Sequence, residues 1–173
     1  RTEQWDKIIE ESKGKLTNYL NMCYLNLALA HKGELADRAF SFDQRGVQGL
    51  MVSWNQTEQI SILLSEITFV MGNSALAQEM AFEAFATSVG EGNPRILKRL
   101  VQTNLIYGEY PVAEKYINVL EKTSCYSSWA NGQRKFLYND AEVEKDPILG
   151  TMRKCLSKDN YLSELNNMEK DLR

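Results

Sequence analysis

The sequence is poor in the side chains that build metal sites and nucleophilic sites. Its 173 residues include one histidine, His31, and three widely spaced cysteines, Cys23, Cys125 and Cys155. A single histidine cannot form the paired-histidine motifs of helical metal sites, and the cysteine spacing does not match a zinc ribbon. An odd number of cysteines leaves at least one thiol unpaired, so buried free thiols are expected, with a Cys125–Cys155 bridge as the alternative. The sequence predicts no metal, no cofactor and no catalytic residue.

Excess positive charge and long apolar runs are also missing. The chain has 20 Lys and Arg against 23 Asp and Glu, for a formal net charge of −3 and a pI near 5.3. Nucleic-acid binding needs clustered positive charge, so no nucleic acid partner is expected. No apolar run approaches the roughly 20 residues of a membrane span, so no direct membrane insertion by this fragment is expected. At this length the simplest expectation is one domain, 1–173.

What the sequence does contain is a helical spacing of apolar residues along nearly its whole length. Apolar side chains recur three and four positions apart, as in Ile60, Leu63, Leu64 and Ile67. Only three prolines are present, each near an expected helix start or in a loop. The pattern predicts an all-α fold, with a loop or short helix over 139–156. The expected helices are 2–13, 18–32, 34–44, 56–71, 73–88, 93–107, 109–122, 125–138 and 157–171.

Three glycines divide this pattern at regular intervals. Gly33, Gly72 and Gly108 each separate two apolar helical stretches, which is typical of a left-handed glycine in a helix–turn–helix. Their spacings of 39 and 36 residues are close to the 34-residue period of tetratricopeptide repeats. The expected hairpins are 18–44, 56–88 and 93–122. The range 2–13 is interpreted as the second helix of a truncated repeat, and 125–173 as a helical cap.

The third turn carries the clearest family resemblance. Gly108-Glu109-Tyr110 followed by Ala113 resembles the tetratricopeptide turn G-[DE]-Y-x-x-A, whereas Arg38 stands at the corresponding alanine position of the first repeat. The resemblance implies antiparallel helix hairpins stacked as a right-handed α-α superhelix. Longer strings, such as NLALAHKGELADRAF and RLVQTNLIYGEYPVAEKYINVLEKT, are similar to the C-terminal soluble region of an uncharacterised bacterial family. That second resemblance implies a membrane-spanning N-terminal half in the parent protein.

The first residue is Arg1 rather than Met, and the helical pattern begins at once without a capping residue. We therefore expect the sequence to be an excised piece of a longer protein. Between the first two hairpins, QRGVQGLMVSWNQ (44–56) is apolar for a connection. It is expected to fold back over the helix ends, with a ligand-contacting loop as the alternative.

The function that goes with such an array is binding by shape. The first helix of each repeat lines a concave groove whose side chains hold a protein or peptide partner. Within that groove, Arg95, Lys98 and Arg99 are candidates for holding a carboxylate or an acidic peptide, and a solvated basic face is the alternative. The predicted partner-binding residues are His31, Gln59, Glu66, Phe69, Arg95, Lys98 and Gln102.

Two other functions remain open from the sequence. Glu66 lies amid apolar residues on an expected helix, as the acid of a glycan-cleaving helical enzyme would. No second acid, phosphate-binding loop or Cys–His pair accompanies it to complete a mechanism. The other alternative is a purely structural spacer. The lone His31, beside Lys32 at a helix C-terminus, also fits a structural role there.

Overall fold

A computed structural model describes residues 4–14, 18–55, 57–88 and 93–156. Over these ranges the chain is all-helical and contains no strand, which confirms the predicted fold class. Three short 3-10 helices, Ala39–Ser41, Val47–Gly49 and Arg134–Phe136, accompany the α-helices. The α-helices are α1 (Trp5–Glu11), α2 (Tyr19–Lys32), α3 (Leu35–Arg38), α4 (Glu58–Val70), α5 (Ser74–Thr87), α6 (Pro94–Tyr107), α7 (Tyr110–Glu121), α8 (Ser127–Gln133), α9 (Asp140–Lys145) and α10 (Leu149–Lys154).

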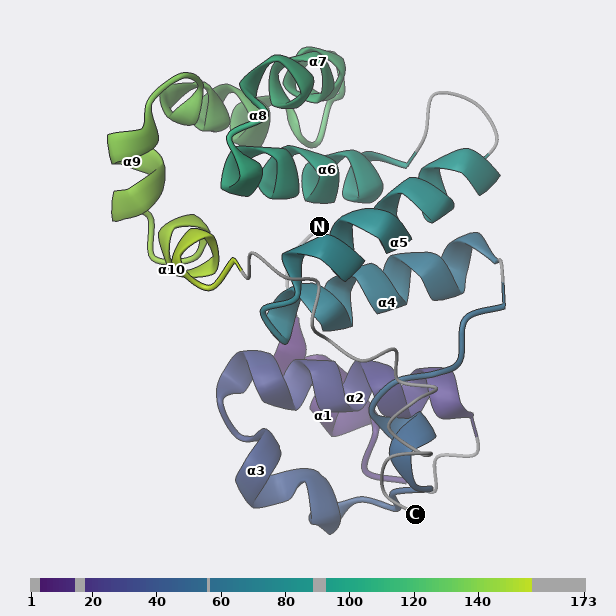
Figure 1. The fold of residues 1–173 in the computed structure, drawn as a ribbon. Coiled ribbons are helices and arrows are strands. Elements are labelled where there is room, and N and C mark those ends of the chain that lie inside the picture. Colours follow the sequence, from purple (N-terminus) through teal and green to yellow (C-terminus); the bar gives the residue numbers. More distant parts are fainter. Residues whose placement is uncertain (1–3, 15–17, 56, 89–92, 157–173) are drawn as a thin grey trace, which may run out of the picture.

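The helices are stacked in tiers (Figure 1). Helices α1, α2 and α3 lie at one end, α4 and α5 in the middle, and α6 and α7 at the other end, while α9 and α10 curve around one end of α6. Helix α4 packs on α5, α5 on α6, and α6 on α7, and α4 also contacts both α2 and α6. No helix in the ranges given above is both long and apolar enough to cross a membrane.

The glycine turns have the predicted conformation. The φ angles of Gly33, Gly72 and Gly108 are 72°, 86° and 78°, in the left-handed region that a side chain disfavours. At the opposite ends of the helices, the side chains of Asn18, Asn73 and Asn93 cap α2, α5 and α6 by accepting backbone N–H groups. Local sequence signals thus determine where these helices begin and end.

Small side chains let the paired helices approach closely. Ala77 and Ala113, five residues after the second and third turn glycines, are fully buried. The Ser65 hydroxyl on α4 donates a 2.8 Å hydrogen bond to the carbonyl of Ala77 on α5. This contact satisfies a buried hydroxyl and brings the two backbones together, as expected for a small residue at a helix crossing.

The first hairpin departs from the predicted 34–44 helix. Helix α3 has four residues and is followed by a 3-10 turn. The chain then packs back on α2, where the Asn26 amide donates to the Gly49 carbonyl at 2.8 Å and exchanges hydrogen bonds with Gln44 at 3.0 and 3.1 Å. Residues 44–52 of the connection 44–56 therefore fold back on α2, because these hydrogen bonds and the packing of Met51 and Val52 hold them there.

The C-terminal part is also more broken than predicted. The expected helix 125–138 is α8 followed by a 3-10 turn, and 139–156 forms two short helices, α9 and α10. At Gly150, which is buried, an added Cβ would lie 2.2 Å from the carbonyl oxygen of Glu144. Only glycine allows α9 and α10 to approach this closely. The predicted helix 157–171 lies outside the described residues.

Substituting two glycines should therefore have opposite effects on stability. Gly108→Ala places a side chain at φ 78° and should lower the free energy of unfolding by about 1–2 kcal/mol. Gly132→Ala lies within helix α8 with open space around it, and should raise that energy by up to about 1 kcal/mol through helix propensity. Urea denaturation followed by circular dichroism measures both. Equal effects of the two substitutions would contradict the assigned turn conformation.

Candidate functional site

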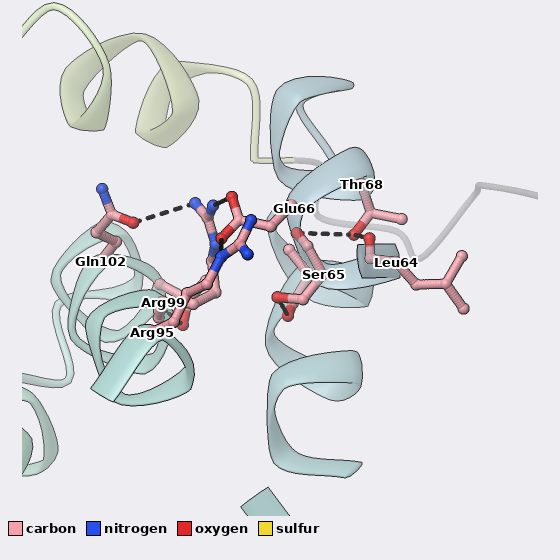
Figure 2. Close-up of polar contacts among 9 residues, drawn as sticks. Leu64, Ser65, Glu66, Thr68, Arg95, Arg99 and Gln102 are labelled. Carbon is pink, nitrogen blue, oxygen red and sulfur yellow. Dashed lines mark hydrogen bonds and ion pairs between the residues drawn. The ribbon is translucent and has the colours of Figure 1, made fainter. Parts of the chain in front are cut away.

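Helix α6 presents its polar side chains in two groups. Arg95 and Arg99, four residues apart, lie beside α4, whereas Lys98 and Gln102 lie on the flank that faces α8 and the loop before α10. Asn93 caps the helix and Pro94 occupies its first turn, so the start of α6, and with it the direction of these side chains, is set locally. Figure 2 shows Glu66 of α4 between the two arginines.

Glu66 and the two arginines form a buried ion-pair network. Glu66 Oε1 accepts a 3.1 Å hydrogen bond from Arg95 Nε, and Glu66 Oε2 accepts one from Arg99 Nη2. The Glu66 side chain is 17% exposed and that of Arg99 only 9%, while Arg95 is half-exposed. The Arg99 guanidinium also lies 3.6 Å from the ring centroid of Phe69, in cation–π geometry. Charges this buried are costly unless paired, so the network ties α4 to α6.

The network holds Glu66 in its ionised form. Burial alone would raise the pKa of this carboxyl, but the charges of Arg99 and Arg95 and their hydrogen bonds outweigh burial and lower it below the ordinary glutamate value. Burial correspondingly lowers the pKa of Arg99, and Glu66 opposes that effect. Glu66 is therefore an anion paired with two cations.

A third side chain extends the network outward. Gln102 Oε1 accepts a 3.1 Å hydrogen bond from Arg99 Nη1, and Figure 2 shows the Gln102 amide nitrogen directed away from Arg99. Arg99 Nε is the one buried side-chain nitrogen or oxygen in the described ranges that has no hydrogen-bond partner. Because Arg99 Nη1 binds the Gln102 oxygen, the nitrogen of that amide faces outward.

Three of the predicted site residues are engaged within the fold. Phe69 is 5% exposed and belongs to the core beneath Arg99, so the expectation that it lines a free groove is wrong. Glu66 and Arg95 face each other rather than an outer groove, since Arg95 Nε binds the Glu66 carboxylate. The candidate basic clamp on α6 is thus largely occupied by the chain's own carboxylate, because a buried arginine needs a partner charge.

His31 lies in another tier of the structure, and Gln59 lies near the start of α4, two helical turns before Glu66. His31 is exposed in the last turn of α2, where its ring stacks on Trp5 with centroids 4.3 Å apart and planes 9° apart. Gln59 is exposed in the first turn of α4. Neither belongs to the Glu66 network, so the structure does not gather the predicted residues into one surface.

Gln102 lines a cleft of about 360 Å³ between α6, α8 and the loop before α10, and Lys98 lies next to the cleft, over Trp129. The Lys98 Nζ lies 5.4 Å from the centroid of the Trp129 ring, which forms one wall. Sequence reasoning missed the importance of Trp129 and its neighbours, although an aromatic residue near the start of the expected helix 125–138 was the available signal. The cleft is lined by Gln102, Ser128, Trp129, Gly132, Gln133, Lys135, Phe136, Asp146, Ile148 and Leu149.

The far wall of the cleft is held in place by Arg153 of α10. Its guanidinium donates to the carbonyls of Leu105 and Ile106 at 2.7 and 3.0 Å, at the end of α6. It also contacts Asp140 Oδ1 at 2.6 Å and the Tyr110 hydroxyl at 3.1 Å. A cation at a helix C-terminus satisfies orphan carbonyls and the macrodipole, so α10 is anchored beside the cleft.

The thiols form no site. Cys23 is buried, and burial raises its pKa to about 11, against a hydrogen bond with Val52 that acts in the opposite sense. Cys125 and Cys155 are free but exposed. The expectation of buried free thiols is therefore confirmed for Cys23, whereas for the other two cysteines the expected burial is wrong. Within the described part of the chain, no group of three or more His, Cys, Asp or Glu side chains is placed to hold a metal.

Comparison with known proteins places the chain in one family. A family model described as a family of unknown function, DUF6057, matches residues 1–173. The chain belongs to DUF6057. No curated protein and no solved structure matches it. The tetratricopeptide resemblance and the membrane-spanning parent therefore stay predictions for this member of DUF6057.

The Glu66 network should make stability depend on pH. In the variant Glu66→Gln, Arg99 loses its buried counter-charge, and the free energy of unfolding should fall by about 3 kcal/mol at pH 7. Because the folded pKa of Glu66 is below its unfolded value, the stabilisation is complete above pH 4.5 and is lost as pH falls through the folded pKa. Urea denaturation between pH 3 and pH 8 measures both effects.

Glu79→Gln is the matched control, because Glu79 is an exposed carboxylate on α5. It should leave stability nearly unchanged at pH 7. A Glu66→Gln protein as stable as wild type at pH 7, or equally destabilised at pH 3 and pH 7, would contradict the assigned ion pair.

Thiol reactivity should separate the three cysteines. At pH 8, Ellman's reagent should modify two thiols of the native protein, Cys125 and Cys155, and the third only in denaturant, because Cys23 is buried with a pKa of about 11. The native Cys23→Ser variant should therefore still show two reactive thiols. Three fast thiols in native wild-type protein, or none, would refute the assignment.

Proposed function

We propose that this member of DUF6057 is a helical-repeat module that binds a protein or peptide segment, as part of a membrane-anchored bacterial protein. The observation that supports it best is the cleft beside α6, which a half-buried donor side chain, Gln102, lines together with aromatic and aliphatic side chains. Placed polar groups next to apolar side chains are the usual composition of a recognition site.

The packing order of the helices supports a repeat module. Helix α5 packs between its own partner α4 and the next first helix, α6, and α4 also touches α6. This is the neighbour relation expected of stacked tetratricopeptide-like hairpins. The proposed site is displaced from the predicted groove, since it lies between α6 and the C-terminal helices rather than along α2, α4 and α6. The membrane-anchored parent rests on the sequence resemblance alone.

The surroundings of Glu66 favour binding over the glycan-cleaving alternative. A general acid needs a protonated carboxyl with a raised pKa, often beside a second acid. Glu66 instead faces Arg95 and Arg99, and its pKa is lowered. A structural spacer, the remaining alternative, gives no reason for an open cleft with an aromatic wall.

A random peptide display library selected on the purified chain tests the proposal. Peptides enriched on wild type should bind at least about tenfold more weakly to Trp129→Ala, because a partly buried aromatic wall is a typical hot spot. The matched control is Trp54→Ala, the same change at a half-exposed tryptophan outside the cleft. It should change the dissociation constant less than twofold. Failure to enrich any peptide, or equal loss in both variants, would argue against the binding site and favour the spacer.

A further inference from the structure

The polarity of the cleft is determined by the buried network behind it. Arg99 donates to Gln102 Oε1, and Arg99 is itself held by Glu66. An amide bound through its oxygen can offer only its two N–H donors on the other side. Figure 2 shows that nitrogen pointing away from Arg99. The Gln102 side chain therefore presents donors to the cleft, and an occupant must supply an acceptor.

Two ammonium groups add positive charge beside the same cleft. Lys98 Nζ lies over the Trp129 ring, and Lys135 Nζ lies 4.7 Å from the Phe136 centroid. Across the described ranges, neither lysine has an acidic partner within 4 Å. Lys135 is electrostatically coupled to Glu142, but that carboxylate is hydrogen-bonded to Lys145. Both lysines are available to a carboxylate.

Asp146, the acidic residue among those that line the cleft, already accepts hydrogen bonds from the backbone. Asp146 Oδ1 accepts hydrogen bonds from the backbone N–H groups of Ile148 and Leu149 at 3.0 and 2.9 Å, just before and at the start of α10. Its charge is thus partly offset by these two donors. The donors that the lining offers an occupant include Gln102 and Lys135, with Ser128 and Gln133 as further polar side chains and Lys98 next to the cleft, over Trp129.

The apolar walls of the cleft complete the description. Trp129 and Phe136 line one side, and Ile148, which is 52% exposed, lies with Leu149 on the other. An exposed isoleucine beside an aromatic wall can bury apolar area only if an occupant brings an apolar side chain. The cleft thus combines donors and cations with an apolar surface.

We propose that this cleft binds a peptide segment that carries Asp or Glu side chains next to a large apolar side chain. The inference rests on the proposed function and names the class of its partner. The apolar side chain lies between Trp129 and Ile148, and the carboxylates accept from Gln102 and pair with Lys98 and Lys135. Cations on two different elements, α6 and the 3-10 turn Arg134–Phe136, suit carboxylates spaced along a segment better than one terminal carboxylate.

Three pools of fluorescent twelve-residue peptides test the partner class, all with amidated C-termini so that no terminal carboxylate is present. Each pool contains Leu and Phe at half of its positions, and the other half are Asp and Glu, Asn and Gln, or Lys and Arg. Fluorescence anisotropy against the full chain should give at least about tenfold tighter binding of the acidic pool than of the neutral pool. The difference should shrink with added salt.

Gln102→Glu tests the role of the fixed amide. Glutamate still accepts from Arg99 with one oxygen, so the fold is expected to be kept, but it turns the second oxygen towards the cleft and repels carboxylates. Acidic-pool binding should weaken at least about fivefold. Gln59→Glu makes the same change at an exposed residue of α4 and should alter binding less than twofold. Should Gln102→Glu fail to fold, Lys135→Gln, at an exposed position, tests the acidic partner instead by removing a cation, and it should also weaken acidic-pool binding.

The outcomes separate the two proposals. Equal binding of the acidic and neutral pools, lost in Trp129→Ala, would overturn the acidic partner and leave the binding function standing. Preference for the basic pool would likewise overturn the acidic side-chain assignment. Absence of binding by every pool would overturn this inference and, with a failed display selection, the proposed function as well.

Discussion

The buried pairing of Glu66 with Arg99 is the interaction on which the packing of the α4–α5 tier against the α6–α7 tier depends. It joins α4 to α6 across 33 residues of sequence, beside the helix α5 that separates them along the chain. A guanidinium this buried is tolerable only next to a counter-charge, so α4 and α6 must keep the register that brings the two together. The same arginine covers Phe69 and orients Gln102. One ion pair thus contributes to the core and to the cleft surface.

The cleft has a second requirement at the opposite end of α6. Arg153 binds the last carbonyls of that helix and holds α10 against it, and the absence of a side chain at Gly150 lets α9 and α10 approach. The wall formed by Ile148 and Leu149 therefore depends on contacts outside the cleft itself. The cleft is thus supported by the fold around it.

Prediction from the sequence succeeded where the physical cause is local. A left-handed glycine ends a helix whatever lies around it, and Gly33, Gly72 and Gly108 all have positive φ. It failed where distant residues decide. Helix α3 has only four residues, and the chain after it packs back on α2, where Asn26 binds Gly49. Phe69 fits a groove position by helical spacing, yet it is buried, because Arg99 from α6 packs over its ring.

The sequence by itself determined the all-α class, the turns and the helix starts, since these follow from backbone conformation and hydrogen bonds within a few residues. It also brought Lys98 and Gln102 together, because residues four apart share a helix face. Only the tertiary structure decided which charges are free. In the sequence, Arg95, Lys98 and Arg99 are equivalent cations on one helix. In the structure Glu66 pairs with the two arginines, which are 29 and 33 residues away along the chain, and Lys98 lies beside Trp129. Burial and pairing are properties of the packed chain, and helical spacing cannot reveal them.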